Sequence, residues 1–147
     1  MPDPDLTDTI LKLSDPDAID LLRRLAEGVG AALPSQDDGD AAMELAREEP
    51  SAAPNDGSAA RLALCLLAED PRYVEPIRAM LANPPAQRMA LDPFTATLLT
   101  SGLLLALQTH VEFVRKTDGT WSLKVIKKPT KDGLLGPLIK KLAALLK

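Results

Sequence analysis

Residues 93–126 set the architecture of this chain, and they read PFTATLLTSGLLLALQTHVEFVRKTDGTWSLKVI. The first part, 93–109, contains no lysine, arginine, aspartate or glutamate, and its leucines cover most of the circumference of a helix. A helix that is apolar all round belongs at the centre of a domain. We therefore expect the other helices to pack around this one.

The second part of the stretch changes from helical spacing to alternation of apolar and polar residues. Residues 111–115 alternate in this way, residues 121–125 do so again, and Thr117-Asp118-Gly119 lies between them. Two alternating runs joined by a turn that contains glycine are typical of a β-hairpin. The pattern predicts an antiparallel hairpin over about 110–128, with Gly119 in the left-handed conformation.

The length of the hairpin loop follows from the register that separates apolar from charged side chains. A two-residue loop would place Phe113 opposite Lys124 and would mix charge with apolar surface on both faces. A three-residue loop with Gly119 as a bulge places Phe113 opposite Leu123 and Glu112 opposite Lys124. We predict this second register, whose other pairs are Val111 with Val125 and Arg115 with Trp121. It gives one apolar face for the core, which includes Val111 and Val125, and one face with a Glu-Lys pair.

Three Asp-Pro pairs, at 15–16, 70–71 and 92–93, mark helix starts. Aspartate at the N-cap accepts free backbone amides, and proline at the first helical position has no amide to leave unpaired. The helix after the first pair is expected to end at Gly28, and a short helix over about 6–13 is expected before it. In the helix after the second pair, Pro76 is expected to cause a kink or a break.

Two segments rich in Pro, Ser, Asp, Asn and Gly predict loops at about 34–40 and 50–57. Between them, a weak helix over about 40–49 has only two large apolar residues and is expected on the surface. The helix over about 58–69 carries leucines on both sides of Cys65, so this helix is expected to be buried.

The last segment, about 132–146, is expected to form an amphipathic helix, with leucines on one face and lysines opposite. Gly136-Pro137 implies a kink there, or a regular helix that begins at Pro137. The sequence as a whole predicts a mainly α (α+β) fold. It would be a single compact multi-helix domain over 1–147, built around the central helix at 93–109, with one hairpin and a C-terminal helix.

The amino-acid composition limits the core and the functional sites that this chain can form. The 147 residues are 46% hydrophobic but only 3% aromatic, so the core must consist mainly of leucine and alanine. With one cysteine and one histidine, Cys65 and His110, the chain lacks the ligand set of a zinc site and cannot form an internal disulfide. It also has no nucleophile elbow and no glycine-rich phosphate loop. We expect no catalytic centre, no metal and no cofactor, and the acidic N-terminus predicts a cytoplasmic protein.

Charge is unevenly distributed along the chain. Residues 1–70 hold 16 acidic and 5 basic side chains, whereas residues 71–147 hold 5 acidic and 12 basic ones. Either the two halves attract each other, within one fold or across a homo-oligomer, or the basic half receives an acidic partner. We predict a small protein-protein interaction or adaptor module that docks an acidic partner through a basic hairpin and the face of the C-terminal helix. The residues predicted to bind the partner are Arg115, Lys116, Lys124, Lys127, Lys128, Lys140 and Lys141.

Two other classes of function stay open. Helices followed by a basic hairpin also suit a winged-helix protein that binds nucleic acid, although the helix before the wing is free of basic residues here. The segment 133–147, with leucine on one side and lysine on the other, would suit binding to a membrane surface.

Overall fold

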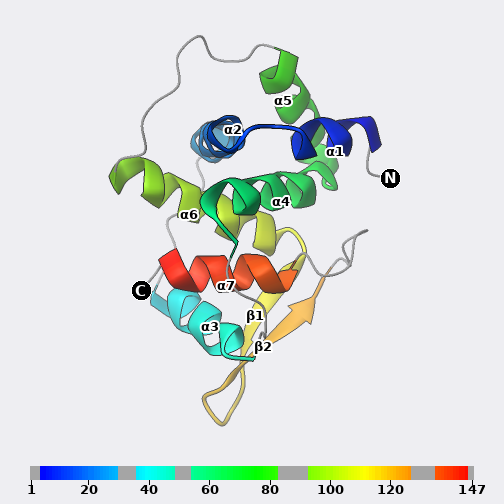
Figure 1. The fold of residues 1–147 in the computed structure, drawn as a ribbon. Helices are drawn as coiled ribbons and strands as arrows, with labels where there is room; N and C mark the ends of the chain where they lie inside the picture. Colours follow the sequence, from blue (N-terminus) through cyan, green and yellow to red (C-terminus); the bar gives the residue numbers. More distant parts are fainter. Residues whose placement is uncertain (1–3, 30–35, 49–53, 83–92, 127–134, 146–147) are drawn as a thin grey trace.

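The computed structural model describes residues 4–29, 36–48, 54–82, 93–126 and 135–145 (Figure 1). In this part of the chain, seven helices and one antiparallel hairpin follow one another, so the predicted mainly α fold with a hairpin and a C-terminal helix is confirmed. The elements are α1 (Pro4–Leu11), α2 (Asp15–Val29), α3 (Gln36–Ala46), α4 (Asp56–Ala68), α5 (Pro71–Ala82), α6 (Pro93–Gln108), β1 (Val111–Arg115), β2 (Trp121–Val125) and α7 (Leu135–Leu145).

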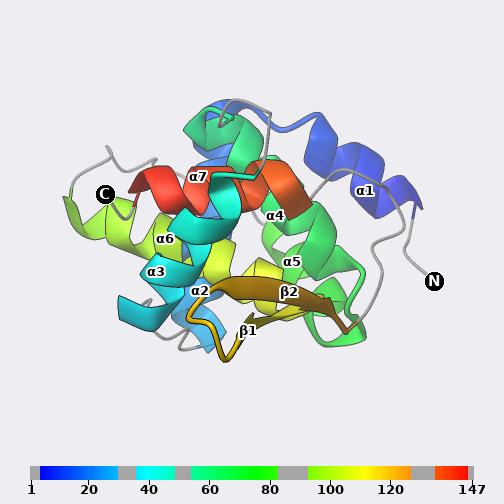
Figure 2. The same cartoon turned by 90° about the horizontal axis from the view of Figure 1, so that it is seen from below.

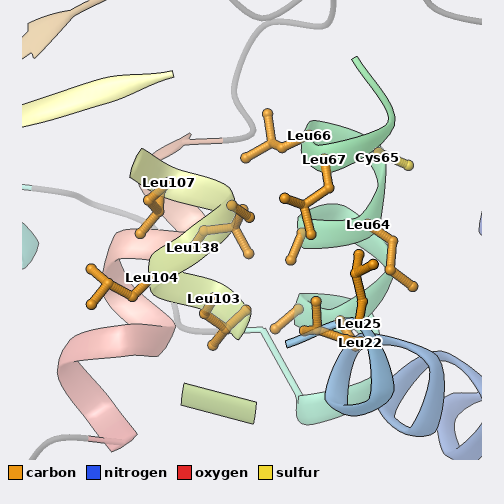
Figure 3. Close-up of a cluster of buried hydrophobic side chains, with 14 of the residues drawn as sticks. Leu22, Leu25, Leu64, Cys65, Leu66, Leu67, Leu103, Leu104, Leu107 and Leu138 are labelled. Carbon is orange, nitrogen blue, oxygen red and sulfur yellow. The ribbon is translucent and has the colours of Figure 1, made fainter. Parts of the chain in front are cut away.

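Two helices share the centre of the molecule. The expected central helix, α6, contacts α2, α4, α7 and β1, and from Thr100 to Leu107 almost every side chain is buried. The helix α4 contacts α1, α2, α5, α6 and α7, and it is equally buried. Figure 3 shows the result, a cluster in which leucines of α2, α4, α6 and α7 converge. The largest fully buried side chains described are all leucine or isoleucine, as a chain poor in aromatic residues requires.

The Asp-Pro pairs stand at helix starts, as predicted. At the second pair, Asp70 caps α5, because its Oδ1 accepts the amide of Arg72 at 3.0 Å. At the first pair the cap is one residue earlier: Ser14 Oγ accepts the amide of Asp17 at 3.3 Å, and α2 begins at Asp15. The helix α6 begins at Pro93, and the aspartate before it lies outside the described residues.

Two helices continue past residues at which an end or a break was expected. Gly28 does not end α2, which continues to Val29. Pro76 does not break α5, which runs through it from Pro71 to Ala82. One proline in a helix removes a single backbone bond, and packing of the rest of the helix outweighs that loss. Pro137 likewise stands inside α7, within the first turn, where amides have no intrahelical partner.

The structure corrects the prediction for α3. This helix begins at Gln36, so residues 36–40, expected in a loop, are helical. It is also not a surface helix, because Ala41, Ala42 and Ala46 are buried and α3 lies against α7 (Figure 2). Few large apolar residues lie on this face of α3, so the sequence predicted a surface helix. Alanine side chains are small, however, and they allow a neighbouring helix to approach closely.

The hairpin has the predicted register. Its pairs are Val111 with Val125, Glu112 with Lys124, Phe113 with Leu123, Val114 with Ser122, and Arg115 with Trp121. The loop is closed by the amide of Lys116, which donates to the carbonyl of Thr120 at 2.8 Å. Gly119 has a φ of +89°, the left-handed conformation that the bulge demands.

The C-terminal helix α7 packs onto the rest of the fold. It contacts α3, α4 and α6, and Leu138, Ile139 and Leu142 are buried there. One cluster of buried residues contains side chains from all seven described helices and from β1. No helix among the described residues combines the length and the apolar character needed to cross a bilayer.

Candidate functional site

The exposed part of the hairpin carries three of the predicted partner-binding residues. Arg115, Lys116 and Lys124 are exposed, and we call this group the basic hairpin surface. The guanidinium carbon of Arg115 lies 6.0 Å from the ring centroid of Trp121, within range of a cation–π contact. Lys127 and Lys128 lie outside the described residues. The structure therefore places three basic side chains on one short, solvent-exposed element.

Two acidic side chains share the hairpin with these bases. Glu112 is exposed and stands opposite Lys124 in the ladder. Asp118 lies in the turn, where its Oδ1 accepts the hydroxyl of Thr120 at 2.6 Å and the amide of Thr120 at 3.0 Å. These hydrogen bonds, first the hydroxyl and then the amide, lower the pKa of Asp118 below its usual value. Asp118 thus shapes the turn, and the described hairpin keeps an excess of positive charge.

Apolar side chains are exposed next to this charge. Val125 is 53% exposed and Ile126 is 62% exposed, directly after Lys124. Only one other large hydrophobic residue in the described part of the chain, Leu11 in α1, is exposed. The end of β2 therefore combines basic and apolar surface, a combination that the sequence did not single out because alternation alone predicted Val125 on the core face.

The two lysines predicted on the C-terminal helix do not join the basic hairpin surface. Lys140 Nζ donates to the carbonyl of Ala46 at 3.3 Å, at the end of α3. Lys141 forms an ion pair with Asp56 in the first turn of α4, and the Lys141 side chain is only 13% exposed. Both contacts tie α7 to helices that lie far away in the sequence, so no local pattern could have shown them.

The structure also shows the exposure of the residues that binding to a membrane surface or to a nucleic acid would use. Leu138 and Leu142, which would have to enter a membrane surface, are buried where α7 contacts α3, α4 and α6. The helix before the hairpin, α6, is almost entirely buried from Thr100 to Leu107 rather than presented to a nucleic acid groove. Trp121 is half-buried and has Arg115 near its ring.

His110 is enclosed in the core. Its Nε2 lies 3.1 Å from the carbonyl oxygen of Leu66 and 4.0 Å from Oε2 of Glu69, whose side chain is also buried. Cys65 is buried in α4, next to Leu66, and forms no disulfide. The imidazole has no exposed surface, and its contact with the backbone joins residue 110 to α4.

Two surface pockets are lined by other residues. One lies beside α2, where Asp17, Asp20 and Arg24 stand next to the apolar Met80 and Leu81 of α5. Asp20 is already engaged, since its two oxygens lie 2.7 Å from Arg23 and 3.4 Å from Arg24.

The second pocket lies where α2, α4 and α7 meet, and Asp15, Asn55, Asp56 and Lys141 line it. Its charges are paired internally: Arg61 Nη1 lies 2.6 Å from Asp15, and Lys141 pairs with Asp56. Within the described ranges, no group of three or more His, Cys, Asp or Glu side chains is arranged to hold a metal ion.

The basic hairpin surface is therefore the candidate that combines exposure, charge and apolar area. The other candidates in the described part of the chain are either buried, as His110 and Cys65 are, or engaged within the fold, as Lys140 and Lys141 are. When the chain is compared with protein-family models, with curated proteins and with solved structures, none of them matches it.

Proposed function

We propose that this chain is a small interaction module that binds an acidic protein partner through the basic hairpin surface. The observation that carries the proposal is the exposed end of the hairpin, where Lys124, Val125 and Ile126 follow one another. Apolar area of this kind supplies affinity when it is covered, and the neighbouring charges select the sign of the partner.

The hairpin is held in place before any partner arrives. Val111 is buried, and Phe113 and Leu123 pack against the core cluster. At the base, the amide of Ile126 donates to the carbonyl of His110 at 2.8 Å, which joins β2 to the end of α6. A binding element that is already ordered loses little conformational entropy on association. The basic hairpin surface thus has the rigid support that a docking site needs.

Capture from an extract of the native host tests this proposal when it compares three forms of the full chain. The first is the wild type, and the second reverses the basic hairpin surface (Arg115→Glu, Lys116→Glu, Lys124→Glu). The third, the matched control, reverses three exposed bases elsewhere (Lys12→Glu, Arg47→Glu, Arg78→Glu). Each variant reverses three charges, so the two variants change the net charge by the same amount.

We expect a stoichiometric companion with the wild type and with the matched control, and its loss with the hairpin variant. Once the companion is purified, the hairpin variant should lower its association rate more than it raises its dissociation rate, because exposed charges act mainly on encounter. The absence of any such companion, or its equal loss with the matched control, would contradict the proposal.

A further inference from the structure

The hydrogen bonds of the hairpin show which backbone groups of β2 point away from β1. Residue 126 donates to residue 110 and residue 116 donates to residue 120, both at 2.8 Å. In an antiparallel ladder, hydrogen-bonded pairs alternate with pairs whose amides and carbonyls point outward. Since residues 110 and 116 are bonded positions, the outward positions on β2 are Trp121, Leu123 and Val125.

This outer edge of β2 has no partner strand in the described part of the chain. The sheet there consists of β1 and β2 alone, and no hydrogen bond between described residues engages the outward groups of Trp121, Leu123 or Val125. A row of unpaired amides and carbonyls on an edge strand is a template for one more strand. Backbone groups could thus supply affinity here in addition to side chains.

The side chains distinguish the two edges of the hairpin. On β2, Lys124 is exposed and is followed by the exposed Val125 and Ile126. On β1, Val111 is buried and the exposed residue at the corresponding position is Glu112. β1 also carries the exposed Arg115, so it has one acidic and one basic side chain, whereas the charged side chain on β2 is Lys124. An acidic strand would meet no like charge on β2 but would lie next to Glu112 on β1, and like charges on neighbouring strands are unfavourable. Charge therefore selects the β2 edge.

We propose that β2 receives an extended, acidic segment of the partner protein as a third strand of the sheet. This inference rests on the proposed function and specifies how the partner binds. A second copy of this chain is the less suitable occupant, because it would bring its own basic hairpin surface against the first. An acidic residue of the partner lies across from Lys124, and its apolar neighbours cover Val125 and Ile126.

Two substitutions at one exposed position isolate the backbone contribution. Val125→Pro removes an outward amide and leaves the bonds between β1 and β2 intact, since proline is tolerated on an edge strand where its nitrogen faces solvent. Val125→Thr is the matched control, because it keeps the amide and the branched shape. The probe is a terminally blocked peptide of seven alternating glutamate and valine residues, and the same peptide with lysine for glutamate is the control probe.

We expect the acidic peptide to slow hydrogen exchange at the amides of Trp121, Leu123 and Val125 in the wild type. Loss of one backbone hydrogen bond should weaken binding about tenfold in Val125→Pro, whereas Val125→Thr should bind like the wild type. Amide spectra of both variants, with the Ile126 amide still protected, verify that the hairpin remains folded. Equal binding of the lysine peptide, protection along β1 instead, equal binding by Val125→Pro, or no binding by the wild type would overturn the inference.

Two further measurements separate this inference from the proposed function. If the native companion is lost by the triple hairpin variant but retained by Val125→Pro, the docking surface stands and the third strand is refuted. If neither variant loses the companion, both proposals fail. Sedimentation of the chain alone tests whether a second copy of the chain binds to the β2 edge instead. If the wild type forms a dimer and Val125→Pro is monomeric, a second copy binds there, and the proposal of an acidic partner segment is wrong.

Discussion

The imidazole of His110 contacts the carbonyl oxygen of Leu66, with 3.1 Å between Nε2 and oxygen, and so joins the start of the hairpin to the last turn of α4. The backbone carbonyl of the same histidine accepts the amide of Ile126 at 2.8 Å. One fully buried residue thus connects a central helix with both strands of the hairpin. Its position explains why the hairpin can project into solvent and still have a fixed base.

Replacement of His110 tests this connection. His110→Phe fills the space but cannot hydrogen-bond to Leu66, so it should lower the free energy of unfolding by about 1–2 kcal/mol. His110→Gln can place an amide nitrogen near the position of Nε2 and should lose less. Urea denaturation of the two variants measures the difference. If the two variants lose the same free energy of unfolding, the hydrogen bond to Leu66 does not stabilise the connection between the hairpin and α4.

Two glycines in helices should respond to alanine in opposite directions. At Gly102 in α6, an added Cβ would lie 2.7 Å from Cγ of Leu22, so Gly102→Ala should force α2 and α6 apart and cost about 1–3 kcal/mol. At Gly28 in α2, nothing lies within 4 Å of an added Cβ. Gly28→Ala should therefore stabilise the protein by about 0.5–1 kcal/mol, because alanine favours the helix. Thermal unfolding measures both, and changes of the same sign would disprove the close approach at Gly102.

The left-handed residue of the turn gives a third prediction. At a φ of +89°, a side chain at Gly119 is strained, so Gly119→Ala should destabilise the hairpin by about 1 kcal/mol. Gly119→Asn should cost less, because asparagine tolerates this region better than other residues with a side chain. Hydrogen exchange at the Lys116 amide, which closes the loop, reports the local effect. Equal exchange in all three proteins would show that the bulge is not needed.

The turn should also respond to pH through Asp118. Because hydrogen bonds from Thr120 lower its pKa in the folded chain, this carboxylate stabilises the turn above the pKa of the unfolded chain, and the contribution is lost as the pH falls through the lower, folded value. Thr120→Val removes the hydroxyl and should raise the pKa of Asp118 towards its usual range. Carboxyl carbon chemical shifts in an acid titration measure this pKa. An unchanged value in Thr120→Val would exclude the hydroxyl as the main cause.

Lysines on α7 and on the hairpin should differ in their contribution to stability. Lys141 is nearly buried and paired with Asp56, so Lys141→Met should leave a charge without its partner and lower the free energy of unfolding by about 1–2 kcal/mol. Lys124 is exposed on β2, and Lys124→Met should change that free energy by less than about 0.5 kcal/mol. Guanidinium denaturation of both variants makes the comparison, and equal losses would contradict the assigned roles.

The parts of the fold that the sequence predicts best are those fixed by local rules. The hairpin register could be predicted residue by residue, because one register alone separates Phe113 and Leu123 from Glu112 and Lys124. Helix starts at Asp-Pro were also predictable, since capping depends on a few adjacent residues. Prediction failed for α3, where alanines are buried because α7 lies against them, and α7 is almost a hundred residues away in the sequence.

The candidate site shows the same division between local and distant effects. Alternation of residues was enough to place Lys124 on the exposed side of the hairpin. Nothing near Lys140 or Lys141 indicates that their partners are Ala46 and Asp56, so both lysines looked available for docking. Val125 was expected against the core, yet at the end of β2 its side chain is 53% exposed.

The position of α7 has a consequence for the biosynthesis of the protein. Leu138 and Leu142 complete a core whose other walls belong to α3, α4 and α6, and the bond from Lys140 to Ala46 spans 94 residues. Contacts between such distant residues form late and slow the search for the native state. The sides of α4 and α6 that face α7 therefore stay uncovered until residues 135–145 have been synthesised and have left the ribosome, and until then they expose apolar surface to chaperones.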